Sequence, residues 1–586
     1  MNHQVTTLDF ETKGIEGNPL IHPPKPVGLA VRLPDGSLDY LTCPQQMRNA
    51  FGDAVHRGPV LFHNAPFDLS VARSHLGIDW PHWSRIHDTM YLVYLADPYA
   101  KTYSLKPSAE RYLGLPPEEQ DAVRLWILAN VPKATDRNWG AFICDAPLEL
   151  LAPYAKKDVE ITFRLWEELY PKTQIEPYDR ERELMPILAA ATIKGVRCNT
   201  PALEQGLERY TSALEHVDHL LRATLQAPSL NPASSQQLAQ ALDDLGLVDD
   251  WVLTPTGARS CDMKNLQVKD PNVMNLLKYR STLKTLNGTF FKGWLEKENN
   301  GRLHPSWNST RGDRDGGTRT GRLSSSAPNF QNIPNPADIV TPAGLPDLPH
   351  MRNYILPEEG HLWLKRDFDA QEIRVMAHFE DGALAEAFRQ DPKLDPHELV
   401  RQEIIRIVGV DYPRKYVKET GFGILYGMGA ATLGSRLGVN SNVSRDLMNA
   451  YKMAIPGVEG LQRGTKNRGR NGHPIRTWGG RLIYTEPPRI VNGYMRSFEY
   501  KLLNYLIQGS SADQTKQAII EWHNKKADQD VFMATVHDEV CISAPERETT
   551  PAMNCLKWAM EDSCKFDVPM RSTGFIGRTW GEVGDE

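Results

Sequence analysis

The chain has 586 residues, of which 40% are hydrophobic and 24% are charged, and its formal net charge is −6. Single domains usually contain roughly 100–200 residues, so we expect three or four structural units. The composition excludes a disordered or fibrous protein. The acidic total excludes a uniformly basic coat protein for nucleic acid, although it leaves room for a local basic cleft.

Three features bear on cellular location. The longest apolar stretch, near Leu184 to Ile193, is about half of the roughly 20 residues that cross a bilayer. The opening residues MNHQVTTLDF lack the basic and apolar regions of a secretory signal. The seven cysteines form no CxxC pair, which favours a reducing compartment. We therefore expect a cytoplasmic protein without a membrane-spanning segment.

The first segment, to about residue 175, alternates strand and helix patterns, which favours an α/β domain. Strands are expected at Val5–Phe10 and Val60–Phe62, and helices at Ser104–Leu113 and Leu148–Leu169. The next segment, from about 181 to 300, is mostly helical. After a connector rich in Gly and Arg, the remainder mixes strands with helices. The expected elements from residue 181 onward are the helices Pro201–Leu225, Pro271–Glu298, Arg414–Tyr426 and Met495–Ile507 and the strands Leu362–Phe368 and Phe532–Ile542.

An acidic set stands out in the first segment. Asp9 and Glu11 lie two residues apart on a strand, so both side chains point to the same side, where they suit a hard cation such as Mg²⁺. Two acids in this spacing, taken alone, are more often solvated. Asp68 follows the second strand, and Tyr154 and Asp158 lie four apart on one helical face.

The segments LDFET, HNAPFD and YAKKD, with HDTMYLVYLADP and YSLKPSAERYLG between the last two, resemble the motifs of the 3′–5′ proofreading exonuclease family. The resemblance implies that Asp9, Glu11, Asp68 and Asp158 hold two Mg²⁺ ions and that Tyr154 orients the attacking water. The substrate would be the 3′ end of single-stranded DNA.

A second constellation lies in the carboxyl-terminal half. Arg414, Lys418, Phe422 and Tyr426 recur every four residues and share one helical face. Burying unpaired cations is costly, so this face suits a nucleotide triphosphate and base better than a core. A surface helix with an aromatic anchor is an equally good interpretation of this helix alone. Two further acidic motifs accompany it, namely Asp367 at a strand end followed by Glu372, and His537-Asp538-Glu539 at the turn of a hairpin.

The segments DFDAQEIR, RKYVKETGFGILYG and HDE, together with TGRLSSSAPNFQNIP and NYLIQGSSADQTK, resemble DNA polymerase family A. The resemblance implies a ribonuclease H-like α/β exonuclease domain at residues 1–175. A right-hand α+β polymerase domain would occupy residues 176–586. Its thumb is expected at about 196–305, its palm at about 306–394 and 496–586, and its fingers at about 395–495.

The family resemblance also implies residue roles. Asp367 and Asp538 would bind two Mg²⁺ ions, with Mn²⁺ able to substitute; the neighbouring Asp369 is an alternative ligand, but the spacing to Glu372 favours Asp367. Glu372 and Tyr426 would exclude a 2′-OH. The remaining roles are triphosphate contacts for Arg414, Lys418 and His397, the nascent-pair pocket for Phe422 and Tyr426, and DNA contacts for Arg322, Asn504, Gln508 and His537.

The expected enzyme is a monomeric, proofreading DNA polymerase that takes primer–template DNA and dNTPs. The exonuclease motif begins at residue 9, so no 5′-nuclease domain is expected, and no thioredoxin-binding insertion is expected between Tyr279 and Trp307. The short N-terminus and the TWGGR stretch (Thr477–Arg481) favour a phage enzyme, working in the host cytoplasm. An exonuclease whose polymerase half only clamps DNA is disfavoured by Lys418 and the two metal aspartates, and a single-subunit RNA polymerase is disfavoured by Glu372.

Positive charge is expected to gather locally despite the acidic total. The segment 461–485 contains no acid, and the connector before Arg322 is also basic. DNA binding should therefore be sensitive to salt. The cations concerned are Arg463, Lys466, Arg468, Arg470, Arg476 and Arg481 in the segment and Arg311, Arg314, Arg319 and Arg322 in the connector.

Overall fold

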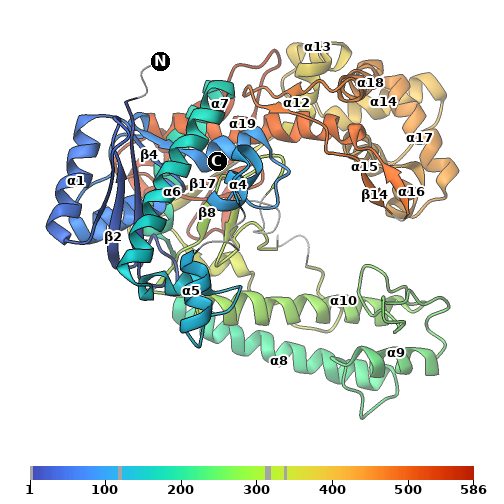
Figure 1. The fold of residues 1–586 in the computed structure, drawn as a ribbon. Coiled ribbons are helices and arrows are strands. Elements are labelled where there is room, and N and C mark those ends of the chain that lie inside the picture. The colour runs from blue at the N-terminus through green and yellow to red at the C-terminus, as the bar shows by residue number, and fades with distance from the viewer. Residues whose placement is uncertain (1–3, 117–121, 311–317, 335–338, 492, 586) are drawn as a thin grey trace.

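The structure is a computed structural model that describes residues 4–116, 122–310, 318–334, 339–491 and 493–585. The three largest hydrophobic cores among these residues lie in the N-terminal domain, between the thumb region and the palm sheet, and in the fingers region. In Figure 1 the N-terminal domain lies at the left, and the helices α8 and α10 project to the lower right beneath the fingers helices.

The N-terminal domain is built on a five-stranded sheet in the order β3-β2-β1-β4-β5. Strand β2 runs antiparallel to both of its neighbours, β1 and β3, whereas β4 and β5 run parallel to β1. This mixed sheet with helices around it is the expected α/β domain. Its strands are β1 (Thr6–Thr12), β2 (Pro26–Arg32), β3 (Leu38–Leu41), β4 (Val60–Phe62) and β5 (Ile86–Asp88).

The helices of this domain bury one apolar face each against the sheet or against one another. The longest helix, α6, contacts β1 and β2 and so brings its acidic face to the central strand. The helices are α1 (Pro44–Arg57), α2 (Ala65–Val71), α3 (Thr89–Ala96), α4 (Leu105–Leu113), α5 (Ala122–Asn130) and α6 (Leu148–Leu169).

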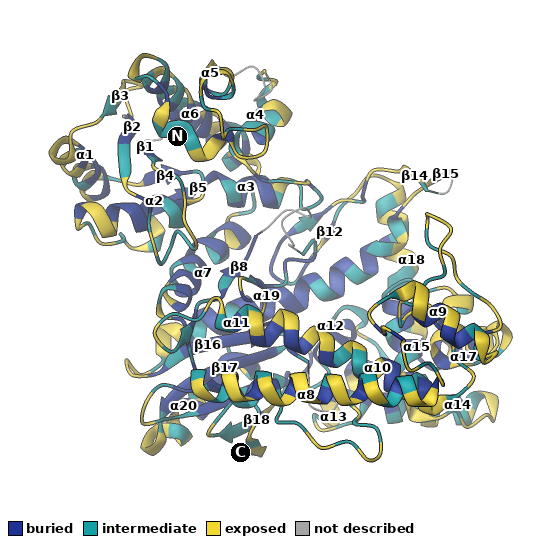
Figure 2. Ribbon diagram, turned by 90° about the horizontal axis from the view of Figure 1, so that it is seen from below, coloured by how far each residue is buried: buried dark blue, intermediate teal, exposed yellow. Residues whose placement is uncertain are grey.

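Helix α7 (Ile175–Lys194) leads from this domain into the carboxyl-terminal half of the chain. The long helices α8 and α10 follow, and Figure 2 shows exposed and buried residues alternating along α8. The expected helix Pro271–Glu298 is present, with a π-helical stretch at Leu286–Lys292. The other elements are α8 (Thr200–Thr224), α9 (Ser235–Asp244), α10 (Pro271–Thr285), α11 (Gly293–Leu295), β8 (Ser306–Asn308) paired with β9 (Ser324–Ser326), and a small sheet of β10 (Ile355–Leu356), β6 (Val196–Cys198) and β7 (Arg302–Leu303).

The palm is an antiparallel sheet in the order β16-β17-β11-β18-β19. Helix α20 packs on this sheet, and the central helix α19 packs on α20. Figure 2 shows that α19 is buried along most of its length. The elements are β11 (His361–Phe368), β16 (Val531–Val536), β17 (Glu539–Pro545), β18 (Ser572–Gly577), β19 (Val583–Asp585), α19 (Leu502–Lys525) and α20 (Thr549–Glu561).

The fingers region is a helical layer whose core also includes α12 and α13, which follow the palm strand β11. Its helices are α12 (Gln371–Glu380), α13 (Ala383–Gln390), α14 (Pro396–Val408), α15 (Arg414–Leu425), α16 (Ala430–Leu437), α17 (Ser441–Ala454) and α18 (Pro456–Arg470). Two small hairpins follow, formed by β12 (Ile475–Arg476) with β13 (Leu482–Ile483) and by β14 (Arg489–Val491) with β15 (Tyr494–Arg496).

The expected helix Met495–Ile507 is wrong at its start. Residues Tyr494–Arg496 form the strand β15, which pairs with β14 across a turn containing Gly493 in the left-handed region. Local pairing across this turn outweighs the helical pattern. The helix α19 begins only at Leu502 and continues to Lys525. Among the described residues, no helix combines the length and apolarity needed to cross a bilayer.

A buried ion pair joins α7 to α19 and gives a stability prediction. Lys516 and Glu181 have side chains only 1% and 2% exposed. Because removal of one partner leaves a buried charge uncompensated, Glu181→Ala should lower the free energy of unfolding by about 3–5 kcal/mol.

Denaturant unfolding would measure this loss. Asp53→Ala serves as the control, because Asp53 forms an exposed pair with Arg57 and its loss should change stability by less than about 1 kcal/mol. Equal effects of the two substitutions would contradict the prediction.

Candidate active sites

The first candidate site lies where strand β1 meets helix α6. Carboxylate oxygens of Asp9, Glu11 and Asp158 all lie within 4.8 Å of one another. The two-residue spacing on β1 places Asp9 and Glu11 on the same side, and α6 packs across that side and brings Asp158. The sequence-predicted acids therefore come together from segments about 150 residues apart.

Asp68, the fourth predicted acid, is buried in α2, and its Oδ1 accepts a hydrogen bond from the Phe10 N–H at 2.9 Å. Burial and the charge of Asp158 raise the pKa of Asp9 to about 8, and burial and neighbouring acids hold the pKa of Glu11 and Asp68 well above their usual range. A cation would relieve this repulsion, and an all-oxygen donor set suits a hard divalent ion. The residues therefore fit the metal site that the family implies.

Lys106 is a member of this site that the sequence analysis missed. Its ammonium group donates a hydrogen bond to Asp158 and lies 4.4 Å from the centroid of the Tyr154 ring. Lys106 belongs to the segment YSLKPSAERYLG, so the resemblance marked its neighbourhood but assigned it no role. Tyr154 thus lies beside the acids, as its spacing from Asp158 predicts.

Asp88, at the end of β5, is a second missed residue. Its carboxylate accepts hydrogen bonds from the backbone N–H groups of Asn64, Ala65 and Met90, at 3.0, 2.8 and 2.8 Å. It thereby fixes the start of α2, the helix that carries Asp68. Burial raises the pKa of Asp88 to about 6.

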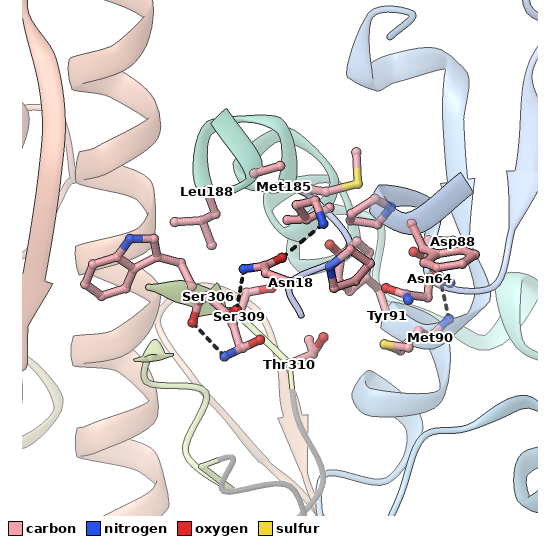
Figure 3. Close-up of a pocket in the computed structure, with 17 residues that line it drawn as sticks. Asn18, Asn64, Asp88, Met90, Tyr91, Met185, Leu188, Ser306, Ser309 and Thr310 are labelled. Atoms are coloured by element: carbon pink, nitrogen blue, oxygen red, sulfur yellow. Dashed lines mark hydrogen bonds between the residues drawn. The ribbon is translucent and has the colours of Figure 1, made fainter. Parts of the chain in front are cut away.

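A pocket of about 230 Å³ lies between this domain and the polymerase half. Figure 3 shows Asn64, Asp88 and Tyr91 on one side and residues of the β8 region on the other. Asn18 crosses the junction, because its Nδ2 donates a hydrogen bond to Ser306 Oγ at 3.0 Å. Asn64, Pro66 and Phe67, which precede Asp68 in the chain, also line the pocket.

The second candidate site lies at the edge of the palm sheet. Asp367 lies near the end of β11, and Asp538 lies in the turn between β16 and β17. The Phe368 N–H donates a hydrogen bond to the Asp538 carbonyl at 3.3 Å, so the turn is held against the strand end. A cavity of about 360 Å³ opens there and is lined by Asp367, His537 and Asp538 among others.

The electrostatics of this pair also suit a cation. Burial and the charge of Asp538 raise the pKa of Asp367 to about 8. Asp367 Oδ1 is buried and has no hydrogen-bond partner in the described part of the chain. Asp369, the alternative ligand, instead accepts a hydrogen bond from Thr573 Oγ1 at 2.7 Å on the neighbouring strand. The buried, unpartnered oxygen is the feature that a divalent ion would satisfy.

The other residues of the HDE motif have different surroundings. Glu539 is buried and accepts hydrogen bonds from Lys365 Nζ and Trp580 Nε1, each at 2.9 Å, so it is compensated within the protein. His537 is exposed and has a positive φ of 57°. Its backbone N–H donates to Gln331 Oε1 at 3.3 Å. The tight turn therefore exposes His537 beside Asp538.

Glu372 links the palm to the fingers. Its carboxylate accepts hydrogen bonds from the Arg322 guanidinium and, at 3.1 Å, from the Tyr426 hydroxyl. Gln508 on α19 also hydrogen-bonds Tyr426. Asn504 lies one helical turn before Gln508 on α19, and its Oδ1 has no partner in the described part of the chain. The structure thus gathers these predicted nucleotide- and DNA-contacting residues in one place.

Helix α15 carries the predicted triphosphate face. Arg414 pairs with Asp395 at 2.7 Å, and Asp395 also caps α14 beside His397. Phe422 stacks with Tyr426 at 6.0 Å between ring centroids and lies 6.1 Å from the ring of His397. Burial, aided by the nearby cations, lowers the pKa of His397 to about 4, so this histidine is neutral. Lys418 lies on the same face of α15.

The expected basic surface is partly wrong. Arg481 is buried and pairs with Asp513 at 2.7 Å. In the connector, Arg319 pairs with Glu486 at 2.8 Å, and Arg311 and Arg314 lie outside the described residues. The positive charge that is at least partly exposed in the segment 461–485 comes from Arg463, Lys466, Arg468, Arg470 and Arg476.

Comparisons with known proteins give a family for each of the two halves of the chain. Residues 200–582 match the model of DNA polymerase family A, and residues 36–174 match that of a 3′-5′ exonuclease. The exonuclease match begins after Asp9 and Glu11, but the structure joins their strand β1 to the matched residues through its pairing with β4.

Similar proteins include phage and bacterial polymerases. The DNA polymerase DpoZ of Vibrio phage phiVC8 is 27% identical over 99% of this chain and 96% of its own length. The thermostable DNA polymerase I of Thermus filiformis is 30% identical over 72% of this chain and 50% of its own length. The chain spans about half the length of these bacterial relatives.

A solved structure shares the fold. The POL domain of Pol1 from M. smegmatis, in complex with DNA primer-template and dNTP, superposes with a TM-score of 0.77 at 22% identity and covers 99% of this chain and 96% of that one. The expected fold class, a ribonuclease H-like exonuclease joined to a right-hand polymerase, is confirmed. Because the family A model spans well over half of the chain, the protein belongs to DNA polymerase family A and is a DNA-directed DNA polymerase with a 3′–5′ exonuclease domain.

Proposed function

We propose that the enzyme replicates phage DNA in the host cytoplasm, with synthesis and proofreading at two separate metal sites. Asp367 and Asp538 would serve synthesis, and the set of Asp9, Glu11, Asp68 and Asp158 would serve 3′ hydrolysis. The observation that carries the proposal is the convergence of Asp367 and Asp538 at the palm edge, with Asp367 Oδ1 buried and unpartnered in the described chain. The phage relatives, named DNA polymerase, support the replicative role.

Divalent metal ions are general requirements of both enzyme domains. We infer two Mg²⁺ ions per site, with Mn²⁺ able to substitute, which would activate the attacking oxygen and neutralise the leaving group. The protein residues supply position and charge around this chemistry.

The incoming triphosphate would lie along α15. Arg414 and Lys418 share one face of this helix and would contact the phosphate oxygens. His397, being neutral and buried beside them, would donate a hydrogen bond to phosphate without adding repulsion between cations. Lys418 would also supply the proton that the leaving pyrophosphate takes up.

Sugar selection would depend on Glu372. A hydrogen bond joins Glu372 to Tyr426, next to the ring of Phe422, and the two side chains would together form the floor of the nascent-pair pocket. A 2′-OH on the incoming nucleotide would collide with this pair, so deoxynucleotides would be favoured. Electrostatic attraction to the phosphates would not give this selection, because a dNTP and an NTP carry the same phosphates.

The primer end would be recognised from α19 and the connector. Arg322, Asn504 and Gln508 have polar groups that suit the minor-groove acceptors present in every correct base pair. His537, exposed beside Asp538, would contact the primer terminus. This arrangement checks geometry and carries no sequence preference.

In the exonuclease site Tyr154 would orient the attacking water, while Lys106 holds Asp158. The substrate is a single-stranded 3′ end frayed from the primer. We further propose that the enzyme works as a monomer on primer–template DNA and without a thioredoxin-type clamp.

Separate substitutions should dissociate the two activities. Asp538→Ala should reduce primer extension at least about a thousandfold while preserving degradation of single-stranded DNA, because it removes a ligand from one metal site only. Asp9→Ala should do the reverse. Primer-extension and 3′-degradation assays on both variants measure this, and each variant is the control for the other. Extension that survives Asp538→Ala would exclude the assigned polymerase site.

Glu372→Ala should relax sugar selection. Opening space at the 2′ position should raise the efficiency of NTP relative to dNTP incorporation at least about tenfold, a free-energy difference of about 1.4 kcal/mol. Steady-state incorporation of each nucleotide measures the ratio. Tyr426→Phe, which keeps the ring and loses only the hydroxyl, should change this ratio less. An unchanged ratio in Glu372→Ala would contradict the proposed role of Glu372 in sugar selection.

Affinity for primer–template DNA should fall steeply with salt despite the acidic total charge. Each phosphate neutralised contributes about 0.9 to the slope of log affinity against log salt concentration. Arg463→Ala, on α18, should lower that slope by about 1. Arg57→Ala, on the remote α1, should leave it unchanged. A flat salt dependence of the unmodified enzyme would contradict a basic binding surface.

A further inference from the structure

Arg481 lies where the exonuclease domain, the fingers and the palm meet. Its side chain is 4% exposed. The Nε atom donates to Asp513 Oδ1 at 2.7 Å, and Nη1 donates to the Tyr94 hydroxyl at 3.0 Å. The Nη2 atom donates to the carbonyl oxygens of Thr320 and Gly509, each at 2.8 Å. One planar guanidinium therefore fixes four oxygens from three parts of the chain.

The two carbonyl groups flank the proposed primer-reading residues. Thr320 lies two residues before Arg322, and Gly509 directly follows Gln508. The side chains of Arg322 and Gln508 both reach the Glu372–Tyr426 pair, since Arg322 hydrogen-bonds Glu372 and Gln508 hydrogen-bonds Tyr426. Arg481 thus links the two backbone segments that carry the proposed primer-reading residues, Arg322 and Gln508.

Glycines on both segments let the guanidinium approach the backbone. Gly321 has a φ of +85°, and a Cβ there would lie 2.5 Å from both Arg481 Nη1 and the Tyr94 hydroxyl. A Cβ at Gly509 would lie 3.1 Å from Arg481 Nη2. The lack of a Cβ at these two glycines therefore leaves the space that the Arg481 guanidinium occupies against the backbone.

The exonuclease domain takes part directly. Tyr94 is buried in α3 and presents its hydroxyl to Arg481 across the domain junction. On the opposite side, Thr477 Oγ1 donates to Asp513 Oδ2 at 2.6 Å and so holds the acid that pairs with Arg481. The rotamer of Arg481 is consequently set from both domains.

We propose that Arg481 is a positioning residue for recognition of the primer end, and that Tyr94 makes this recognition depend on the exonuclease domain. The proposal rests on the proposed function of Arg322 and Gln508 as minor-groove readers. A mismatched primer end, which misplaces the minor-groove acceptors, is rejected only when both readers are held at a fixed separation. Loosening Arg481 would therefore weaken discrimination against mismatched ends more than it slows extension of matched ends.

The test is the ratio of kcat/KM for dNTP addition to matched and to mismatched primer ends, with a phosphorothioate 3′ linkage that resists hydrolysis. Arg481→Lys should lower this ratio about tenfold, because the single ammonium nitrogen of lysine cannot reach all four oxygens that the guanidinium contacts. Tyr94→Phe removes one hydroxyl and should lower it about threefold. Combining Tyr94→Phe with Gln508→Ala should give less than the product of the separate effects, because both act through the same pair of readers.

Tyr91→Phe is the matched control. Tyr91 lies on the same helix and hydrogen-bonds Ser309 across the same junction, without touching Arg481. Its loss should leave the ratio unchanged. If Gln508→Ala lowers the ratio but Arg481→Lys and Tyr94→Phe leave it unchanged, as Tyr91→Phe should, the positioning role of Arg481 is overturned. The proposed reading role of Gln508 then stands. If Gln508→Ala leaves the ratio unchanged, both are overturned.

Discussion

Repulsion between buried carboxylates is the constraint around which both sites are built. At the palm edge, β11 and the β16–β17 turn hold Asp367 and Asp538 together, and at the exonuclease site β1, α2 and α6 hold four acids. Folding alone would not favour such clusters, because each buried charge is costly without a partner. The rigid sheets maintain these arrangements, and bound cations would offset their cost. The sites proposed for synthesis and for proofreading thus have the same physical basis on two different folds.

The two halves are joined by buried polar contacts as well as by chain connectivity. Lys516 and Glu181 pair between α19 and α7, and Arg481 contacts Tyr94 and Asp513. Such contacts are directional, so they fix orientation more strictly than apolar packing does. The exonuclease domain is consequently part of the structure that surrounds the proposed polymerase site.

Much of this could be predicted from the sequence because the relevant signals are local. The β-prone run ending at Asp367 and the four-residue repeat of Arg414 to Tyr426 each predict an element and the side on which its functional residues lie. The helix expected from Met495 was wrong, since pairing of β15 with β14 decides that segment.

Residues whose role depends on distant neighbours could not be found in this way. Arg481 was counted with the exposed cations of its segment, although Asp513 and Tyr94, far away in sequence, bury and pair it. Lys106 and Asp88 were missed for the same reason, because only the folded chain brings them to the acids and to α2. Sequence spacing reveals partners within one element, whereas partners between elements require the tertiary structure.

The central claim is that each carboxylate cluster is a divalent-ion site, and direct metal binding tests it independently of activity. Calorimetric titration of the metal-free enzyme with Mn²⁺ should reveal two classes of sites. Asp367→Ala should remove one class and Asp9→Ala the other. Identical binding curves for the unmodified enzyme and both variants would contradict the account.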